Sequence, residues 1–300
     1  MKTTRRLALA IGAGAIGCVL PPAHRNARAA PDTFDALRED FAALEMASDG
    51  RLGVAVLDTR AGVSGFIGYH ADERFPLCST FKVLAAAAVL KRVDDGKEQL
   101  DRRVKFEASD LVTYSPVTKD HVGGDGMTVG ELCTAAMTVS DNTAGNLILA
   151  SLGGPQALTD YVRSLGDAVT RLDRIEPDLN EALPDDPRDT TTPAAMVKTM
   201  QGLVVGDALS KSSREQLTAW LVGNKTGDAR LRAGLPPAWR VGDKTGSGER
   251  GTSNDVAIAW PPNSAPVLIA VYLTGTTVTA EARNGAIAAI GTAIAARLRA

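Results

Sequence analysis

Ser79-Thr80-Phe81-Lys82 opens an apolar run, VLAAAAVL at positions 83–90, whose length and composition predict a helix. Residues three apart share one face of a helix, so Lys82 is expected to stand beside Ser79. Ser79 would lie at the helix start, where free N–H groups and the helix dipole favour developing negative charge. A serine hydroxyl becomes an effective nucleophile when a neighbouring group removes its proton. Taken alone, however, this tetrad fits an N-cap serine followed by a solvated lysine better.

Strands are predicted on both sides of a long helical region. Hydrophobic and turn patterns place them at residues 52–57, 65–69, 239–243, 256–260 and 267–273. From residue 79 to about 222 the pattern is helical, with many loops and no convincing strand. The last three strands are joined by short turns that leave no room for a long crossover, so antiparallel pairing is expected.

Amphipathic helices are predicted near both ends of the chain. Their apolar faces comprise Phe34, Leu37, Phe41 and Leu44 in the first helix and Ile287, Ile290, Ile294 and Leu298 in the last. These patterns predict an α/β plus all-α protein, in which both chain ends form an antiparallel sheet flanked by helices and a helical lobe is inserted. We assign residues 30–75 and 222–300 to an α/β domain and residues 76–221 to a helical domain. A cleft between two such lobes would be a natural ligand site.

Residues 1–29 have the features of a signal peptide. They comprise a basic start at Lys2, Arg5 and Arg6, an uncharged apolar stretch at 7–20, and a small-x-small cleavage site at Ala27-Arg28-Ala29. The paired arginines also resemble a twin-arginine export signal. We therefore expect a periplasmic protein that is not anchored in a membrane in its mature form. Lipidation at Cys18 is the weaker alternative, because Ala15 is a poor residue three before the cysteine.

Charge and composition exclude several classes of function. Five of the 33 basic residues lie in the first 29 positions, so the mature chain has 28 Lys+Arg against 35 Asp+Glu, a net charge of −7. An acidic chain without a basic stripe is a poor candidate for binding nucleic acid or an anionic membrane. Only His70 and His121 remain after cleavage, far apart, so neither a zinc site nor a Ser-His-Asp triad is expected. No metal or cofactor is called for.

Two cysteines, Cys78 and Cys133, remain in the mature chain. In an oxidising compartment they could form a disulfide. Cys78 directly precedes Ser79, however, and Cys133 lies in an apolar helical stretch. Buried free thiols are therefore the preferred prediction, since free cysteine is among the most buried residue types.

Two further motifs follow the serine and lysine. Ser140-Asp141-Asn142 offers a hydroxyl that could pass a proton to a leaving nitrogen and an amide that could hold a substrate carbonyl, although alone it would be a helix cap or turn. Lys-Thr-Gly occurs at 225–227, in a polar loop, and at 244–246, where it ends the strand predicted at 239–243. We choose the second copy, because its glycine lets another backbone approach a strand edge closely.

These motifs, in this order, resemble those of the penicillin-recognising serine enzymes, which include class A β-lactamases and cell-wall transpeptidases. The stretch from Arg174 to Asp189 resembles the Ω-loop of the class A enzymes and has the length of a compact loop. By that resemblance Glu176 and Asn180 hold a water against the acyl-enzyme, and Arg174 and Asp189 close the loop by an ion pair. The resemblance also implies a cis peptide between Glu176 and Pro177.

The resemblance extends over essentially all of the mature chain and implies a substrate site. Its residues would be Tyr114, Asn142, Asn180, Arg230, Lys244, Thr245, Gly246 and Ser247. Many members carry an arginine at the position of Ser253, and Arg230 matches the place where other members supply that guanidinium instead. We therefore expect Arg230 to meet the substrate carboxylate, for which a planar fork is better suited than a lysine.

The family resemblance implies a monomeric hydrolase of small-molecule β-lactams, penicillins and cephalosporins. Ser79 would attack the lactam carbonyl, Ser140 would pass a proton to the nitrogen, and Glu176 would activate the deacylating water. Whether Lys82 or Glu176 deprotonates Ser79 stays open. The alternatives are a transpeptidase or carboxypeptidase that deacylates slowly, and an antibiotic-sensing domain that stays acylated. Gly248 stands where carbapenem-hydrolysing members often place a cysteine, which lowers the expectation of that activity.

Overall fold

The computed structural model describes residues 31–60 and 65–298, so the predicted signal peptide and Cys18 lie outside the described residues. The helices are α1 (Pro31–Ser48), α2 (Phe81–Asp94), α3 (Val129–Thr138), α4 (Asn142–Leu152), α5 (Pro155–Ser164), α6 (Pro193–Val204), α7 (Lys211–Val222), α8 (Leu231–Gly234) and α9 (Ala280–Leu298). The strands are β1 (Arg51–Asp58), β2 (Phe66–Tyr69), β3 (Phe75–Pro76), β4 (Arg103–Val104), β5 (Met127–Thr128), β6 (Thr190–Thr191), β7 (Arg240–Ser247), β8 (Ser253–Trp260) and β9 (Val267–Thr274). Within the described ranges, no helix combines the length and the apolar character needed to cross a membrane.

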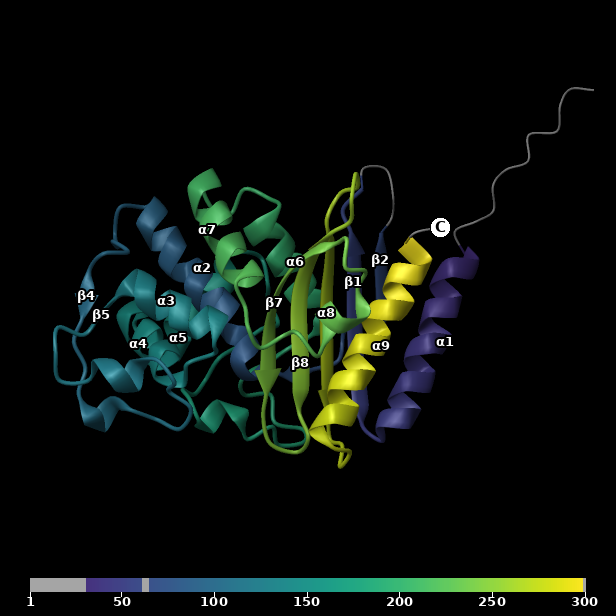
Figure 1. Cartoon of the computed structure of the whole chain (residues 1–300), viewed down its shortest axis with the longest axis horizontal. Helices are drawn as coiled ribbons and strands as arrows, with labels where there is room; N and C mark the ends of the chain where they lie inside the picture. Colours follow the sequence, from purple (N-terminus) through teal and green to yellow (C-terminus); the bar gives the residue numbers. More distant parts are fainter. Residues whose placement is uncertain (1–30, 61–64, 299–300) are drawn as a thin grey trace, which may run out of the picture.

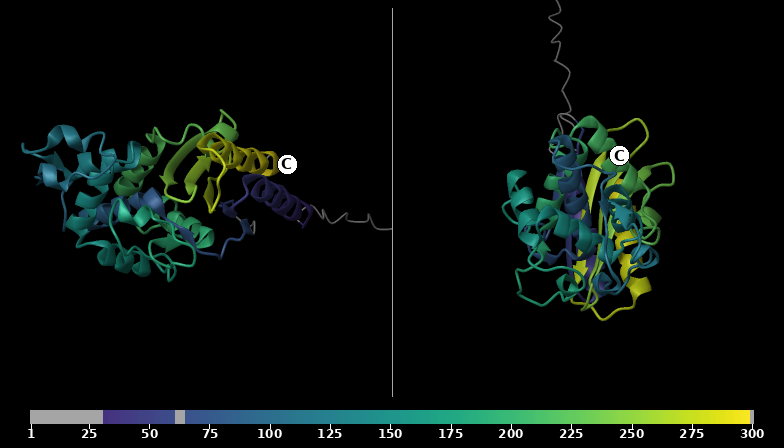
Figure 2. Two further views of the ribbon diagram at one scale, coloured as in Figure 1. Left: turned by 90° about the horizontal axis from the view of Figure 1, so that it is seen from below. Right: turned by 90° about the vertical axis from the view of Figure 1, so that its left-hand side faces the viewer.

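Both ends of the chain contribute to one five-stranded sheet (Figure 1). Its order is β2-β1-β9-β8-β7, and every neighbouring pair is antiparallel. The central pairing, β1 with β9, joins residues more than 200 positions apart in the sequence. The helices from α2 to α7, which come between β2 and β7 in the sequence, lie on the side of the sheet opposite α1 and α9 (Figure 2). This arrangement confirms the predicted fold class.

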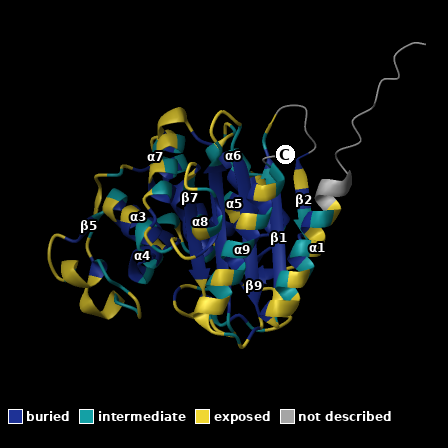
Figure 3. Ribbon diagram, turned by 45° about the vertical axis from the view of Figure 1, so that its right-hand side comes forward, coloured by how far each residue is buried: buried dark blue, intermediate teal, exposed yellow. Residues whose placement is uncertain are grey.

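The two terminal helices cover one face of the sheet (Figures 1 and 3). The completely buried side chains at this interface include Leu37, Phe41, Ile287, Ile290 and Ile294, which pack with alternate residues of the strands. Burying an aliphatic or aromatic side chain of this size contributes about 1.5–3 kcal/mol relative to leaving it exposed. The predicted apolar faces are thus confirmed, with Leu44 and Leu298 only partly buried and the side chain of Phe34 outside the described part.

Helix α2 runs through the middle of the helical part. All ten side chains from Phe81 to Leu90 are buried. A helix that is apolar on every side has to be surrounded by protein, which explains why this run has no amphipathic period. Lys82 is the single charged residue in that buried stretch, and its ammonium group points into the site described below.

Two details differ from the sequence-based expectations. Strand β7 continues to Ser247, so the second Lys-Thr-Gly lies inside the strand and not at its end. Pairing with β8 down to Ser247↔Ser253 supplies ladder hydrogen bonds that offset the weak strand propensity of glycine and charged residues. Short strand pairs also form, β3 with β6 and β4 with β5, and β4, β5 and β6 lie in the region where no strand was expected. Each pair is two residues long, too short to leave a period in the sequence.

Candidate active site

Ser79 lies in a short turn that leads into α2. Residues 76–80, which we call the nucleophile turn, include a single 3-10 turn at Cys78–Thr80. Cys78 has a φ of +43°, in the left-handed region that a non-glycine residue adopts only when its surroundings hold it there. The hydroxyl of Ser79 lies 2.9 Å from Lys82 Nζ and 3.2 Å from Glu176 Oε1. The predicted serine and lysine are therefore brought together, and a carboxylate joins them.

The ammonium group of Lys82 is completely buried among polar groups. It lies 2.9 Å from Glu176 Oε1 and donates to Ser140 O at 3.0 Å and to Asn142 Oδ1 at 2.7 Å. Burial lowers the pKa of Lys82 below its usual range, and the nearby Glu176 carboxylate opposes part of that shift. A lysine with a lowered pKa more readily gives up its proton, so its amine can accept one from Ser79.

Ser140 stands between two buried lysines at the start of α4. Its Oγ accepts a hydrogen bond from Lys244 Nζ at 3.0 Å and lies 3.5 Å from Lys82 Nζ. The next residue, Asp141, is the N-cap of α4 and accepts from Ala144 N at 2.9 Å. The motif is thus both a helix cap and part of the site, because the cap fixes where the Ser140 hydroxyl points.

The loop from Arg174 to Asp189 brings Glu176 to Ser79. Arg174 Nε and Asp189 Oδ2 are 2.6 Å apart, which confirms the predicted ion pair, and the peptide before Pro177 is cis, also as predicted. Glu176 itself is 1% exposed, and its second oxygen accepts from Asn180 Nδ2 at 2.5 Å. The loop therefore presents a buried, hydrogen-bonded carboxylate to the serine.

Asn146 is a residue of this site that sequence reasoning missed. Its side chain accepts from Glu176 N and donates to Glu176 O, both at 2.9 Å, and so holds the main chain of Glu176 at both polar groups. The available signal was its position four residues after Asn142, which puts both amides on one face of α4.

Strand β7 contributes two polar side chains to the site, Lys244 and Thr245. Lys244 is completely buried, and burial together with the charge of Lys82 lowers its pKa to about 7. Its Nζ contacts Ser140 Oγ and the carbonyl of Thr245, at 3.0 and 2.8 Å. Thr245 Oγ1 lies 2.5 Å from Thr226 Oγ1. The first Lys-Thr-Gly, at 225–227, lies in a loop as expected, but its Thr226 contacts Thr245 of the second copy.

Arg230 reaches the end of β7. Its donors contact Gly246 O at 2.8 Å, Asn254 O at 2.6 Å, Ser247 Oγ at 2.8 Å and Asn284 Oδ1 at 2.9 Å. The guanidinium is thereby fixed beside Ser247, whose side chain is exposed. Together with Lys244 it places two basic side chains at this end of β7.

Comparison with known proteins agrees with this geometry. A sequence model of the β-lactamase enzyme family matches residues 36–298. β-Lactamase CTX-M-97 from Escherichia coli is 52% identical over 255 residues, which cover 85% of this chain and 87% of that protein. β-Lactamase AST-1 from Nocardia asteroides is 51% identical over 248 residues, 83% of this chain and 79% of that protein. The solved structure of the last common ancestor of Gram-negative bacterial class A β-lactamases is 64% identical, with a TM-score of 0.86 over 88% of this chain and 99% of that one.

The chain belongs to the class A β-lactamases. It hydrolyses the amide bond of penicillins and cephalosporins through a serine acyl-enzyme, an activity that confers antibiotic resistance. The family membership predicted from the motifs is therefore confirmed.

The remaining predicted residues of the β-lactamase lie around this centre. Tyr114 is 56% exposed, and its carbonyl accepts from Asn142 N at 3.0 Å. The amide of Asn142 donates to Thr113 O at 2.9 Å, so one of its two protons is already engaged. Cys78 is a buried free thiol, as predicted, and so is Cys133. Burial raises the pKa of the Cys78 thiol well above its usual range, so it stays protonated beside the nucleophile.

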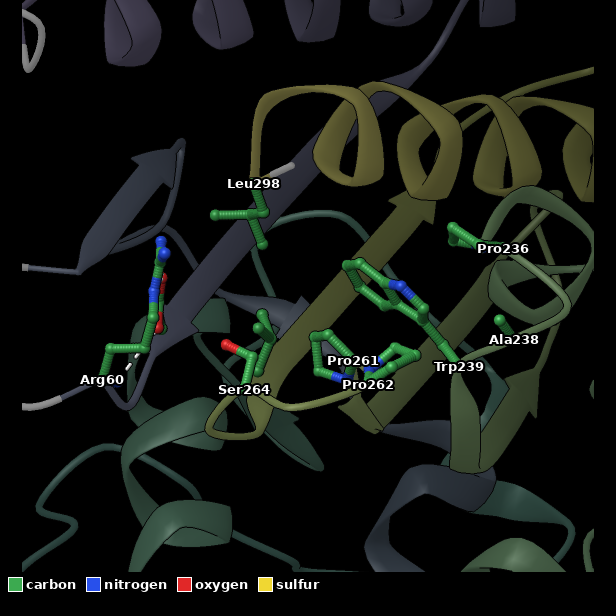
Figure 4. Close-up of a pocket in the computed structure, with 10 residues that line it drawn as sticks. Arg60, Pro236, Ala238, Trp239, Pro261, Pro262, Ser264 and Leu298 are labelled. Carbon is green, nitrogen blue, oxygen red and sulfur yellow. Dashed lines mark hydrogen bonds and ion pairs between the residues drawn. The ribbon is translucent and has the colours of Figure 1, made fainter. Parts of the chain in front are cut away.

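The β-lactamase has a separate hollow of about 340 Å³ at the opposite end of β7 (Figure 4). Trp239, which precedes that strand, lines it together with prolines from two loops and Leu298. Among the described residues that line this hollow there is neither a lysine nor a glutamate. It therefore lacks the combination of groups found around Ser79.

Proposed function

We propose that Ser79 is the nucleophile of this β-lactamase and that Lys82 and Glu176 are the two groups in reach of its proton. The observation that carries the proposal is the position of Ser79 Oγ, 2.9 Å from Lys82 Nζ and 3.2 Å from Glu176 Oε1, in a buried site. Both distances suit general-base catalysis. The variants Lys82→Met and Glu176→Gln distinguish the two candidate bases. The variant that lacks the base acting on Ser79 should acylate more slowly than the other.

Ser140 then passes a proton to the nitrogen that leaves when the lactam ring opens. Its hydroxyl contacts Lys244 Nζ at 3.0 Å and lies 3.5 Å from Lys82 Nζ, so a proton taken up by Lys82 can reach the nitrogen through it. Main-chain N–H groups of Ser79 and Ser247 stabilise the oxyanion. A donor of this kind contributes about 10²–10³ in rate.

Glu176 and Asn180 act in the second half of the reaction, when water removes the acyl group. Glu176 accepts a hydrogen bond from Asn180 Nδ2, which orients its carboxylate. The other atom of that amide, Asn180 Oδ1, is buried and has no hydrogen-bond partner in the described part of the chain. A water held between this acceptor and Glu176 would lie close to Ser79, where the ester carbonyl forms.

The end of β7 that carries Lys244 and Ser247 binds the carboxylate common to these substrates. Lys244, Thr245, Ser247 and Arg230 converge there. Gly246 keeps the strand close to the nucleophile turn, because a Cβ at this position would lie 3.1 Å from Leu77 O. Asn142 and Tyr114 would contact the acyl side chain from the opposite side.

We also infer that residues 1–29 direct export and that the mature enzyme works as a periplasmic monomer. The basic start and the uncharged stretch after it support export. The division into residues 30–75 with 222–300 and residues 76–221 is supported by two hydrophobic clusters, one between the sheet and the terminal helices and one that fills the helical part and extends to the other face of the sheet.

Peptide mapping by mass spectrometry tests the assignment of the nucleophile. Benzylpenicillin is added to the Glu176→Gln variant, and the modified peptide is sequenced. We expect the added mass on Ser79 and its loss in the double variant that also carries Ser79→Ala. Ser164→Ala, an exposed serine at the end of α5, is the matched control and should leave the adduct in place. An adduct on any other residue would contradict the proposal.

A further inference from the structure

A completely buried asparagine lies between the nucleophile turn and the strand that binds substrate. Asn254 belongs to β8 and is paired with Gly246 of β7 and Tyr272 of β9. Side chains alternate along a strand, so Asn254 shares a face with Val256 and Ile258, which pack into the cluster that contains α2. Its side chain therefore faces the nucleophile turn and not α9.

The carboxamide of Asn254 donates into that turn. Its Nδ2 contacts the carbonyl oxygens of Pro76 at 2.8 Å and Leu77 at 3.2 Å, which are the two residues before Cys78. Leu77 O also accepts from the hydroxyl of Thr80 at 2.7 Å. These bonds flank Cys78, whose left-handed backbone needs external support.

The orientation of the carboxamide follows from its neighbours. If it were rotated by 180°, its oxygen would face two carbonyl oxygens, so the nitrogen has to point toward the turn. The oxygen, Asn254 Oδ1, is buried without a hydrogen-bond partner in the part of the chain that the structure describes. A buried acceptor without a partner is unfavourable. The donated bonds are thus the feature that explains an asparagine at this position.

The turn and β7 lie close together beside this amide. A Cβ on Gly246 would lie 3.1 Å from Leu77 O and 3.2 Å from Asn254 Nδ2. We infer that Asn254 is a positioning residue, which sets the distance between the nucleophile turn and β7. It thereby sets the spacing of the Ser79 and Ser247 N–H groups, and in this the inference rests on the proposed function.

Replacing the Asn254 side chain should affect acylation of Ser79 more than substrate binding. Arg230 contacts only the main-chain oxygen of Asn254, at 2.6 Å, so replacing the side chain leaves that contact in place. Substrate binding through Arg230 should therefore change little. Acylation should slow, because a small misplacement of reacting groups can reduce a rate about 100-fold.

The test compares Asn254→Asp with the wild-type enzyme in stopped-flow acylation by benzylpenicillin between pH 5 and pH 8. At pH 8 the new carboxylate would face two carbonyl oxygens, so we expect acylation about 10- to 100-fold slower, with the dissociation constant of the initial complex within about threefold. Lowering the pH should restore part of the rate in this variant alone, because a protonated carboxyl supplies one O–H donor. Asn254→Ser, which keeps one hydroxyl donor, should acylate at an intermediate rate. It replaces the aspartate variant in this test if that variant does not fold.

Ile258→Ala is the matched control, since it removes a completely buried side chain from the same face of β8. It should lower the melting temperature without changing the acylation rate constant. Wild-type acylation in Asn254→Asp at every pH, or an equal loss in Ile258→Ala, would overturn the inference. Failure of the Glu176→Gln variant to form an adduct on Ser79 would instead overturn the proposed function, so the two failures are distinguishable.

Discussion

Replacing Glu176 with glutamine should trap the acyl-enzyme. The substitution keeps the size of a side chain that lies 3.2 Å from Ser79 Oγ, but it removes the carboxylate and its 2.9 Å ion pair with Lys82. A positioned general base contributes about 10²–10⁴ in rate. This corresponds to about 2.7–5.4 kcal/mol of transition-state stabilisation. We therefore expect the deacylation rate constant to fall by this factor.

Quenched-flow sampling with intact-protein mass spectrometry measures that rate constant directly. After benzylpenicillin is added, the variant should show one acyl group per enzyme that decays about 10²–10⁴ times more slowly than in the wild-type enzyme. Asp178→Asn is the matched control, because Asp178 is an exposed carboxylate in the same loop. It should turn over at the wild-type rate. Wild-type turnover by Glu176→Gln, or equal trapping in the control, would refute the reasoning.

Three further predictions concern charge, substrate binding and the core. Burial lowers the Lys244 pKa from 10.5 to about 7, so the unfolded chain binds more protons between these values and the free energy of unfolding should rise with pH across that window. In urea titrations from pH 7 to 10, the free energy of unfolding should rise less with pH in Lys244→Met than in the wild type. An equal rise in both proteins would contradict the lowered pKa of Lys244. Arg230→Lys should raise KM for benzylpenicillin about tenfold with little change in kcat, because an ammonium cannot reproduce the planar fork beside Ser247; an unaltered KM would count against carboxylate binding there. Ile290→Ala should lower the free energy of unfolding by about 2–5 kcal/mol in chemical denaturation while kcat/KM at 25 °C stays constant. A loss of activity in the folded variant would show that this part of the core also affects the active site.

The sequence carried strong local signals for the parts of the site that depend on close spacing. Ser79 and Lys82 meet because three residues span one turn of helix, and the cap at Asp141 is a short-range feature of the same kind. The strands were predictable from their periodicity, and their antiparallel pairing from the short turns between them. Family resemblance supplied the Arg174–Asp189 ion pair, which joins residues 15 positions apart.

Contacts between distant segments left no such signal. Asn254 donates to Leu77 across 177 positions, and a lone asparagine in a strand is usually a surface or turn residue. Thr226 was set aside with its motif, because its contact with Thr245 appears only when the loop packs on β7. The end of β7 was placed too early for a similar reason, since the strand is maintained there by pairing with β8 and not by its own residues.

Benzylpenicillin hydrolysis by purified residues 30–300, followed with mass spectrometry of the protein during the reaction, tests the central claim most directly. We predict many turnovers per enzyme molecule with little accumulated adduct, because Glu176 and Asn180 are positioned beside Ser79 to activate water. A stoichiometric, long-lived adduct on Ser79 without turnover would contradict the role given to Glu176.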